Sequence, residues 1–142
     1  MSTAENKVIA YRILDEVFSQ GNLSKIDELF SPDITVHDPD KELRGREQVE
    51  RGLTLLRRAF PDLYYTVEDM IAEDDKVVVR FTGRGTHQGE FRGVSPTGKA
   101  MSYTGIVILR FVESRLVDYW AVSDALGIFQ QLGVYPPVAR PS

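Results

Sequence analysis

The sequence predicts an α+β fold, in which a cone-shaped, curved antiparallel sheet is covered by three N-terminal helices. Two observations support this fold class. Apolar residues recur at helical spacing before Pro61, and after it the apolar pattern changes to a period of two. The chain has 142 residues, the usual size of one domain with one core, and it shows no internal repeat or linker.

The helices are predicted from their ends and their apolar faces. The first is expected to begin at the capping box Ser2-Thr3-Ala4-Glu5 and to end at Gly21. A short second helix is expected to end at Ser31-Pro32. The third follows Gly45 and is closed by Pro61. The apolar stripe of the third helix consists of Val49, Gly52, Leu53, Leu56 and Phe60.

Alternating polarity predicts the strands. The stretch DITVHD is expected to be a short strand with Ile34, Val36 and Asp38 on one face, interrupted by Pro39. Four longer strands are expected in LYYTVEDMIAE, KVVVRFTGRGTH, AMSYTGIVILRFV and RLVDYWAVSD. Tight turns are expected at Asp74-Asp75 and at Glu113-Ser114.

The stretch GTHQGEFRGVSPTGKAM, from Gly85 to Met101, predicts a long structured loop because its glycines and Pro96 favour turns. The stretch ALGIFQQLG predicts a short last helix. Residues 134–142 are a proline-marked tail without periodicity. We therefore expect one domain over residues 1–142 with an ordered core of about residues 4–133.

Composition argues against several classes of function. With 17 basic and 21 acidic residues the net charge is −4, and no basic run suggests binding to nucleic acid. The absence of cysteine excludes disulfides and thiolate chemistry. No signal peptide or membrane span is recognisable, so a cytoplasmic location without membrane contact is expected. The chain has only two histidines, far apart, and its glycine loop matches no nucleotide motif, so neither a metal nor a cofactor is expected.

Three stretches closely resemble the SnoaL-like polyketide cyclases and ester cyclases of the nuclear transport factor 2-like superfamily. They are DITVHDPDKELRGREQVERGL, AFPDLYYTVEDMIAEDDKVVVRFTGRGTHQGEFRGVSPTGK and RLVDYWAVSDALGIFQQLG. The resemblance implies a cystatin-like α+β barrel that encloses an apolar pocket for a small molecule, commonly in a homodimer paired through the sheet. It also implies a cofactor-free intramolecular aldol condensation, in which an acid/base group first takes a proton alpha to a carbonyl.

By this resemblance the acid/base aspartate lies on the last strand, and Asp124 is the position that we assign to it, with Asp118 as the alternative. Strand parity puts both acids on one face with Trp120. Asp124 directly precedes the last helix, however, so a helix cap is an equally good interpretation of this residue.

His37 and Asp38 form a second candidate group. Asp38 falls where the related ketosteroid isomerases place a proton-shuttling aspartate, although Leu14 appears where those enzymes have a phenol. Parity directs His37 to the opposite face, so its catalytic role depends on a bend at Pro39. A solvated turn pair is the alternative interpretation of both residues.

His87, at the start of the glycine loop, is expected to polarise a substrate carbonyl or to orient Asp124, or else only to brace the loop. Arg80 lies among valines and either pairs with an acid inside the barrel or points outward. Phe60 and Tyr103 are among the rings that line a pocket for a flat ligand or fill an ordinary core.

The leading hypothesis is a cofactor-independent cyclase acting on an apolar, carbonyl-bearing small molecule. The alternative is a non-catalytic module of the same fold that binds a small molecule or a partner. A third possibility is an isomerase-like proton shuttle that uses Asp38. An enzyme should hold Asp124 or Asp38 in an apolar cavity with a raised pKa, whereas a binding module should have both acids capped, paired or solvated.

Overall fold

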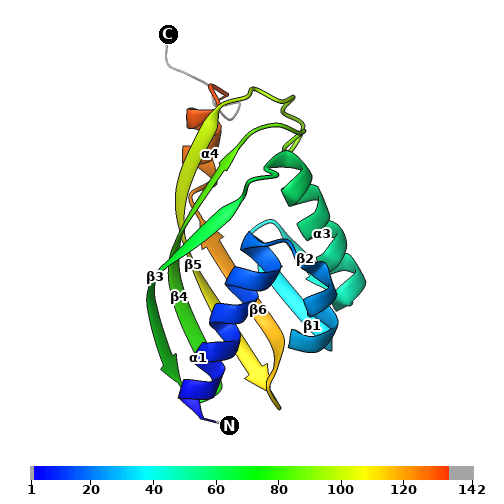
Figure 1. Ribbon diagram of the computed structural model, residues 1–142, viewed down its shortest axis with the longest axis vertical. Coiled ribbons are helices and arrows are strands. Elements are labelled where there is room, and N and C mark those ends of the chain that lie inside the picture. The colour runs from blue at the N-terminus through cyan, green and yellow to red at the C-terminus, as the bar shows by residue number, and fades with distance from the viewer. Residues whose placement is uncertain (1, 135–142) are drawn as a thin grey trace.

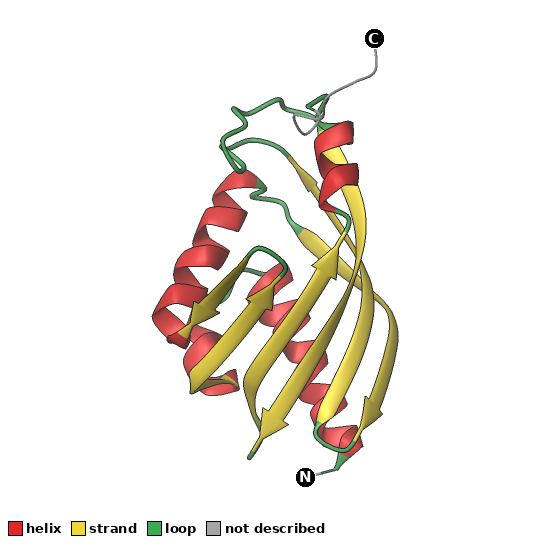
Figure 2. Ribbon diagram, turned by 180° about the vertical axis from the view of Figure 1, so that it is seen from behind, coloured by secondary structure: helices red, strands yellow, loops and turns green. Residues whose placement is uncertain are grey.

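The computed structural model describes residues 2–134, in which a curved six-stranded sheet carries the N-terminal helices on one face (Figure 1). The view from behind shows the opposite face of the sheet, which these helices do not cover (Figure 2). The predicted α+β class and the cone-like curvature of the sheet are therefore confirmed. The greater part of the proline-marked tail, residues 135–142, lies outside the described residues.

The first helix begins and ends where the sequence predicts. Ser2 is the N-cap of α1 (Thr3–Arg12), and its Oγ accepts a hydrogen bond from the Glu5 N–H at 3.0 Å. The helix continues as the π-helical segment η1 (Ile13–Ser19) and stops before Gly21, whose φ is +69°. Arg57 of α3 (Gly45–Ala59) donates to the Phe18 carbonyl at 2.8 Å, so it satisfies a carbonyl at the end of η1.

The second helical segment is shorter than expected. The 3₁₀ turn η2 (Leu23–Lys25) and α2 (Ile26–Leu29) lead directly into β1 (Phe30–Asp38). Pro32 therefore lies inside a strand rather than at a helix end, and the pairing of β1 is irregular at that point. A further strand, β2 (Lys41–Arg44), pairs with β1 although the sequence predicted none there.

The remaining strands are β3 (Tyr64–Glu73), β4 (Lys76–Thr86), β5 (Ala100–Val112) and β6 (Arg115–Ser123). The sheet order is β2-β1-β6-β5-β4-β3. Tight turns join β3 to β4 and β5 to β6 as expected, with positive φ at Asp74, Glu113 and Ser114. The sheet departs from a purely antiparallel one because β1 and β6 pair in parallel.

The last helix, α4 (Ala125–Gln131), lies against β5 beyond the end of β6. The Gln131 amide donates to the Ser102 carbonyl at 2.7 Å and accepts from the Ser102 N–H at 2.8 Å. A side chain of α4 thus makes the hydrogen bonds that a neighbouring strand would make, and this fixes the helix on the sheet.

Buried side chains fill one end of the cone. The larger cluster packs α1, η1 and α2 against β1, β4, β5 and β6, with Ile13, Leu14, Ile34 and Leu109 at most 1% exposed. A smaller cluster around Phe60, Leu63, Met101 and Ile128 joins α3 to β5 and α4. The space between the two clusters is where a cavity forms.

Two glycines make room for aromatic rings on the inner face of the sheet. Gly105 pairs with Phe81 across β4 and β5, and a Cβ on Gly105 would lie 2.6 Å from the Phe81 ring. Gly83 pairs with Tyr103 in the same way, also at 2.6 Å. Each ring therefore lies over a neighbouring glycine.

We expect Gly105→Ala to lower the free energy of unfolding by about 1–3 kcal/mol, because the new methyl group would overpack against Phe81. Urea denaturation would measure the change. Gly52→Ala in α3 is the control, since its Cβ would meet only the flexible Leu43 Cδ1, at 3.1 Å, and a helical alanine is favoured over glycine. Equal effects of the two substitutions would contradict the packing argument.

Candidate functional site

A cavity of about 690 Å³ lies between the inner face of the sheet, α3 and the loop that follows β4. Its volume is typical of sites for small molecules. Apolar and aromatic side chains supply most of its lining. The rings in the lining are Phe18, Phe30, Phe60, Tyr65, Phe81, Phe91, Tyr103 and Tyr119.

Asp38 is the half-buried carboxyl in this lining. It ends β1 on the same face as Val36, which also lines the cavity. Burial raises the pKa of the Asp38 carboxyl, and the nearby charge of Asp40 raises it further, while Lys41 and Arg92 act in the opposite direction. The net result is a carboxyl that holds its proton at higher pH than an ordinary aspartate.

Three phenols from three strands share the cavity with Asp38. The hydroxyls of Tyr65 on β3 and Tyr103 on β5 are 2.9 Å apart and share a hydrogen bond. Tyr119 on β6 is 8% exposed and lies next to Val36 in the register of β1 with β6. Burial raises the pKa of all three phenols, and the charge of Asp38 contributes for Tyr119, so each stays protonated near neutral pH.

This arrangement can support proton transfer. A carboxyl of raised pKa can take a proton and return it close to neutral pH. Neutral phenols can donate hydrogen bonds to an oxygen on which negative charge develops. The apolar walls would strengthen both effects by excluding water.

Asp124 does not line the cavity, although its neighbours Ser123 and Ala125 do. Its side chain is exposed, and its Oδ1 accepts a hydrogen bond from the Gly127 N–H at 2.9 Å. The structure thus gives Asp124 the position of the α4 N-cap, the alternative that the sequence left open. Its predicted acid/base role stays a prediction and has no support from the cavity.

His37, Asp118 and Trp120 lie together on the outer face of the sheet. The His37 Nε2 is 3.0 Å from the Asp118 Oδ1, and the imidazole stacks on Trp120 with ring centroids 5.0 Å apart. Burial acts to raise the pKa of Asp118, but hydrogen bonds from His37 and Arg110 outweigh it and hold the pKa below its usual range. None of the three residues lines the cavity. His37 points outward as strand parity predicted, and the pocket roles expected for His37, Asp118 and Trp120 have no support from the cavity.

Arg80 also lies on the outer face, where its Nη2 is 2.6 Å from the Asp69 Oδ2. It therefore pairs with neither Asp38 nor Asp124. Phe60 and Tyr103, by contrast, line the same cavity as Asp38.

His87 is fully buried under the loop that joins β4 to β5 and is not part of the cavity lining. Its Nδ1 accepts a hydrogen bond from the Thr97 N–H at 3.2 Å, which assigns the proton of a neutral imidazole to Nε2. The Thr97 hydroxyl is a second partner of Nδ1, at 3.0 Å. These contacts brace the loop, as the simpler interpretation of this residue expected.

The sequence offers Tyr65 and Tyr119 only as rings that line a pocket or fill a core, and it predicts no chemical role for either. Both were visible as rings on predicted strands, but only the pairing of β1 with β6 brings Tyr119 beside the end of β1. Parity along β6 was the available signal, because Tyr119 shares a face with Ala121 and Ser123, which also line the cavity.

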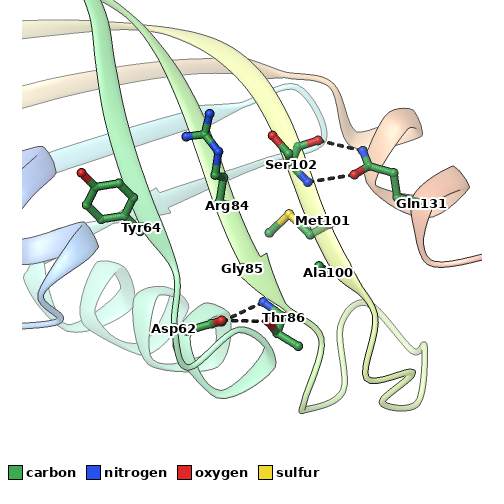
Figure 3. Close-up of a pocket in the computed structure, with 9 residues that line it drawn as sticks. All are labelled: Asp62, Tyr64, Arg84, Gly85, Thr86, Ala100, Met101, Ser102 and Gln131. Atoms are coloured by element: carbon green, nitrogen blue, oxygen red, sulfur yellow. Dashed lines mark hydrogen bonds between the residues drawn. The ribbon is translucent and has the colours of Figure 1, made fainter.

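A smaller hollow of about 400 Å³ lies near α4 and is lined by residues of β3, β4 and β5 (Figure 3). Many of its polar groups are already engaged. The Asp62 carboxylate accepts hydrogen bonds from the N–H and the hydroxyl of Thr86, and Gln131 bonds the backbone of Ser102 (Figure 3). This pairing leaves little polar recognition for a ligand at the hollow.

Residues 2–134 offer no candidate metal site and no helix that could span a membrane. No group of three or more histidine and acidic side chains there is placed to hold a metal ion. None of the helices in this part of the chain is long and apolar enough to cross a membrane.

Comparisons with known proteins agree on one family. The sequence model described as SnoaL-like polyketide cyclase matches residues 8–132. The aklanonic acid methyl ester cyclase DnrD of Streptomyces peucetius is 31% identical over 107 residues, which are 75% of this chain and 72% of DnrD.

Solved structures give the same fold. AclR of Streptomyces galilaeus, a candidate hydroxylase, matches with a TM-score of 0.84 and 35% identity over 95% of this chain and all of AclR. IdmH of Streptomyces antibioticus, a candidate polyketide cyclase, matches with a TM-score of 0.80 and 32% identity, over 91% of this chain and 99% of IdmH. The neighbours thus share one fold, while their names point to more than one reaction.

Asp38→Asn should stabilise the protein above the pKa of Asp38. The pKa of Asp38 is raised in the folded protein. Below the unfolded pKa of about 3.9 Asp38 is protonated in both states, so it does not lower the free energy of unfolding. Above the folded pKa Asp38 is ionised in both states, and the free energy of unfolding is lowered by the full amount. The stability difference between variant and wild type should therefore grow as the pH rises through this window.

Urea unfolding of both proteins between about pH 3 and pH 8 would measure this difference. Asp33→Asn is the matched control, because Asp33 is an exposed aspartate of β1 whose charge does not contribute to the pKa shift of Asp38. A difference that shrinks with rising pH would show that Asp38 is stabilised in its ionised form.

Proposed function

The chain belongs to the SnoaL-like polyketide cyclase family, and from this premise we propose that it closes a ring in an apolar, carbonyl-bearing small molecule by cofactor-free acid/base chemistry. One observation carries the proposal: a half-buried carboxyl of raised pKa, Asp38, lines an apolar cavity together with three protonated phenols. Enzymes commonly tune a carboxyl in this way when it must exchange a proton near neutral pH.

The proposed reaction is an intramolecular aldol addition. The ionised Asp38 takes a proton from the carbon alpha to a carbonyl, and the enolate oxygen accepts a hydrogen bond from a phenol. The enolate carbon then bonds to a second carbonyl carbon of the same molecule. Protonated Asp38 returns its proton to the new alkoxide, so the carboxylate is regenerated and no oxidant or reductant is consumed.

Tyr119 is the phenol best placed for this role. It pairs with Val36 near the end of β1, and the charge of Asp38 raises its pKa. Tyr65 and Tyr103 bond each other and form a second donor pair along the same wall. Phe60 and the other rings would hold a flat substrate between α3 and the sheet.

The residues outside the cavity take supporting roles in this proposal. His87 braces the loop over the cavity, and Asp124 caps α4. On the outer face, His37, Asp118 and Trp120 hold the end of β1 to β6. Arg80 pairs β4 with β3 through Asp69.

An isomerase-like proton shuttle is a second candidate function, favoured by the same carboxyl and phenols. Leu14 is buried in the core and no tyrosine of the first helix lines the cavity, but Tyr65, Tyr103 and Tyr119 supply phenols from the sheet instead. A non-catalytic binding module is the alternative if the cavity takes ligands without turnover.

Asp38→Asn should reduce turnover of a polyketide ester at least about 100-fold, because the amide cannot act as the base. Aklanonic acid methyl ester, named in the cyclases similar to this chain, is the first substrate to assay. Wild-type kcat/KM should rise with pH through the raised pKa of Asp38, where the base form appears.

Asp124→Asn and Asp33→Asn, both at exposed positions, are the controls and should retain most activity. Loss of turnover in Asp124→Asn alone, with the fold intact, would return the acid/base role to the last strand. The ester and an enone probe of isomerisation would both be tested with the wild-type protein. If both bind and neither is turned over, the result favours the binding module.

We also propose a homodimer formed through the outer face of the sheet. Ile106 and Val122 face each other across β5 and β6 and are 48% and 68% exposed. Ile108 and Trp120 form the next pair along the same two strands. A contiguous apolar surface of this kind usually marks an interface.

Val122→Glu should convert the dimer to a monomer, because it would place two buried carboxylates across the two-fold axis. Light scattering after size exclusion would measure the mass. Val8→Glu is the matched control, since Val8 is 61% exposed on α1, on the helical side of the sheet. A wild-type mass of one chain at micromolar concentration would rule out the stable dimer.

A further inference from the structure

The charge in the lining of the cavity is opposite in sign to that of the whole protein. Its charged side chains are Asp38, Lys41, Arg58, Glu90 and Arg92. Three are cations and two are acids, so their formal sum is +1, whereas the whole chain carries −4. Cations thus outnumber acids in the lining, although the chain as a whole is acidic.

The three cations have no ion-pair partner among residues 2–134. Several other arginines are engaged. Arg12, Arg80 and Arg110 each bind a carboxylate, and Arg46 and Arg57 donate to backbone carbonyls. The cations around the cavity thus keep their hydrogen-bond donors available to a ligand.

Arg92 holds a backbone conformation that an arginine rarely adopts. Phe91 and Val94 pair across a tight turn in which Arg92 has φ +47° and Gly93 has φ +83°. Asparagine or glycine suits such a position better than arginine does. The side chain lies over the Phe91 ring, with its guanidinium carbon 5.5 Å from the ring centroid. A strained residue in the lining of a cavity points to a role for its side chain.

The three cations come from separate parts of the fold. Lys41 begins β2, Arg58 lies in the last turn of α3, and Arg92 is in the loop between β4 and β5. Lys41 and Arg92 are both close enough to Asp38 to influence its pKa, so they lie at the same end of the cavity as that carboxyl.

We propose that these three side chains form an anion subsite, so that the preferred ligand is a flat carbonyl compound carrying a carboxylate. The apolar body fills the chamber between the rings, and the carboxylate lies among Arg92, Lys41 and Arg58. The inference rests on the proposed function and adds the substrate class. It predicts a preference for a free acid over its methyl ester, whereas DnrD is named for a methyl ester.

A matched pair of ligands tests the subsite directly. Anthraquinone-2-carboxylate and its methyl ester share a flat, carbonyl-bearing body and differ by one charge. Equilibrium dialysis at low salt should give an affinity about tenfold higher for the acid. Raising the ionic strength to about 0.3 M should reduce this ratio and leave the affinity for the ester unchanged, because exposed charges are screened.

Arg92→Asn removes the positive charge without disturbing the turn, because asparagine accepts the positive φ and the loop should keep its shape. The ratio of the two affinities should fall about threefold or more in this variant, with the affinity for the ester unchanged. Arg51→Gln, on α3 and outside the cavity lining, is the control and should keep the full ratio.

The outcomes distinguish this inference from the proposed function. Equal binding of acid and ester by wild type overturns the subsite and leaves the cyclase proposal standing. Binding of neither ligand overturns both. A preference for the acid that survives in a triple variant, Arg92→Asn with Lys41→Gln and Arg58→Gln, also overturns the subsite, because the anion must then be held elsewhere.

Discussion

The parallel pairing of β1 with β6 is the contact on which the rest of the site depends. In its register Val36 lies beside Tyr119 and His37 beside Trp120. Because side chains alternate along a strand, this one register sends Asp38 into the cavity and His37 to the outer face. A shift by one residue would exchange the two and remove the acid from the chamber. The contacts of His37 with Asp118 and Trp120 on the outer face therefore help to keep Asp38 on the inner one.

The cavity exists because the core does not fill the whole cone. Long apolar side chains from α1 and η1 occupy one end, whereas toward the other end the sheet carries Gly83 and Gly105 under aromatic rings. The walls of the cavity are thus flat and apolar, and only a few polar groups interrupt them. Burial of Asp38 costs stability at neutral pH, and a carboxyl retained at such a cost is typical of sites where activity opposes stability.

Much of the fold was predictable because its signals are local. The capping box at Ser2, the end of the first helix before Gly21 and the turns at Asp74 and Glu113 lie where the sequence places them. There is a physical reason why the sequence did not predict β2. Its four residues, Lys41–Arg44, show no clear alternation of polar and apolar side chains, and only their pairing with β1 makes them a strand. The same holds for Pro32 inside β1, which is tolerated because the ladder is irregular there.

The sequence by itself determined the α+β class, the order of most elements and the family, because periodicity, caps and turn residues act over a few neighbouring positions. It also determined that Asp38 and His37 must face opposite sides of their strand. The cap at Asp124 is a local contact with Gly127, and the sequence already offered it as one of two interpretations. Which of those sides is the cavity, and that Tyr119 faces the chamber, was decided only by the tertiary structure. The reason is that both outcomes depend on β1 meeting β6, two strands almost 80 residues apart, and no local pattern encodes that contact.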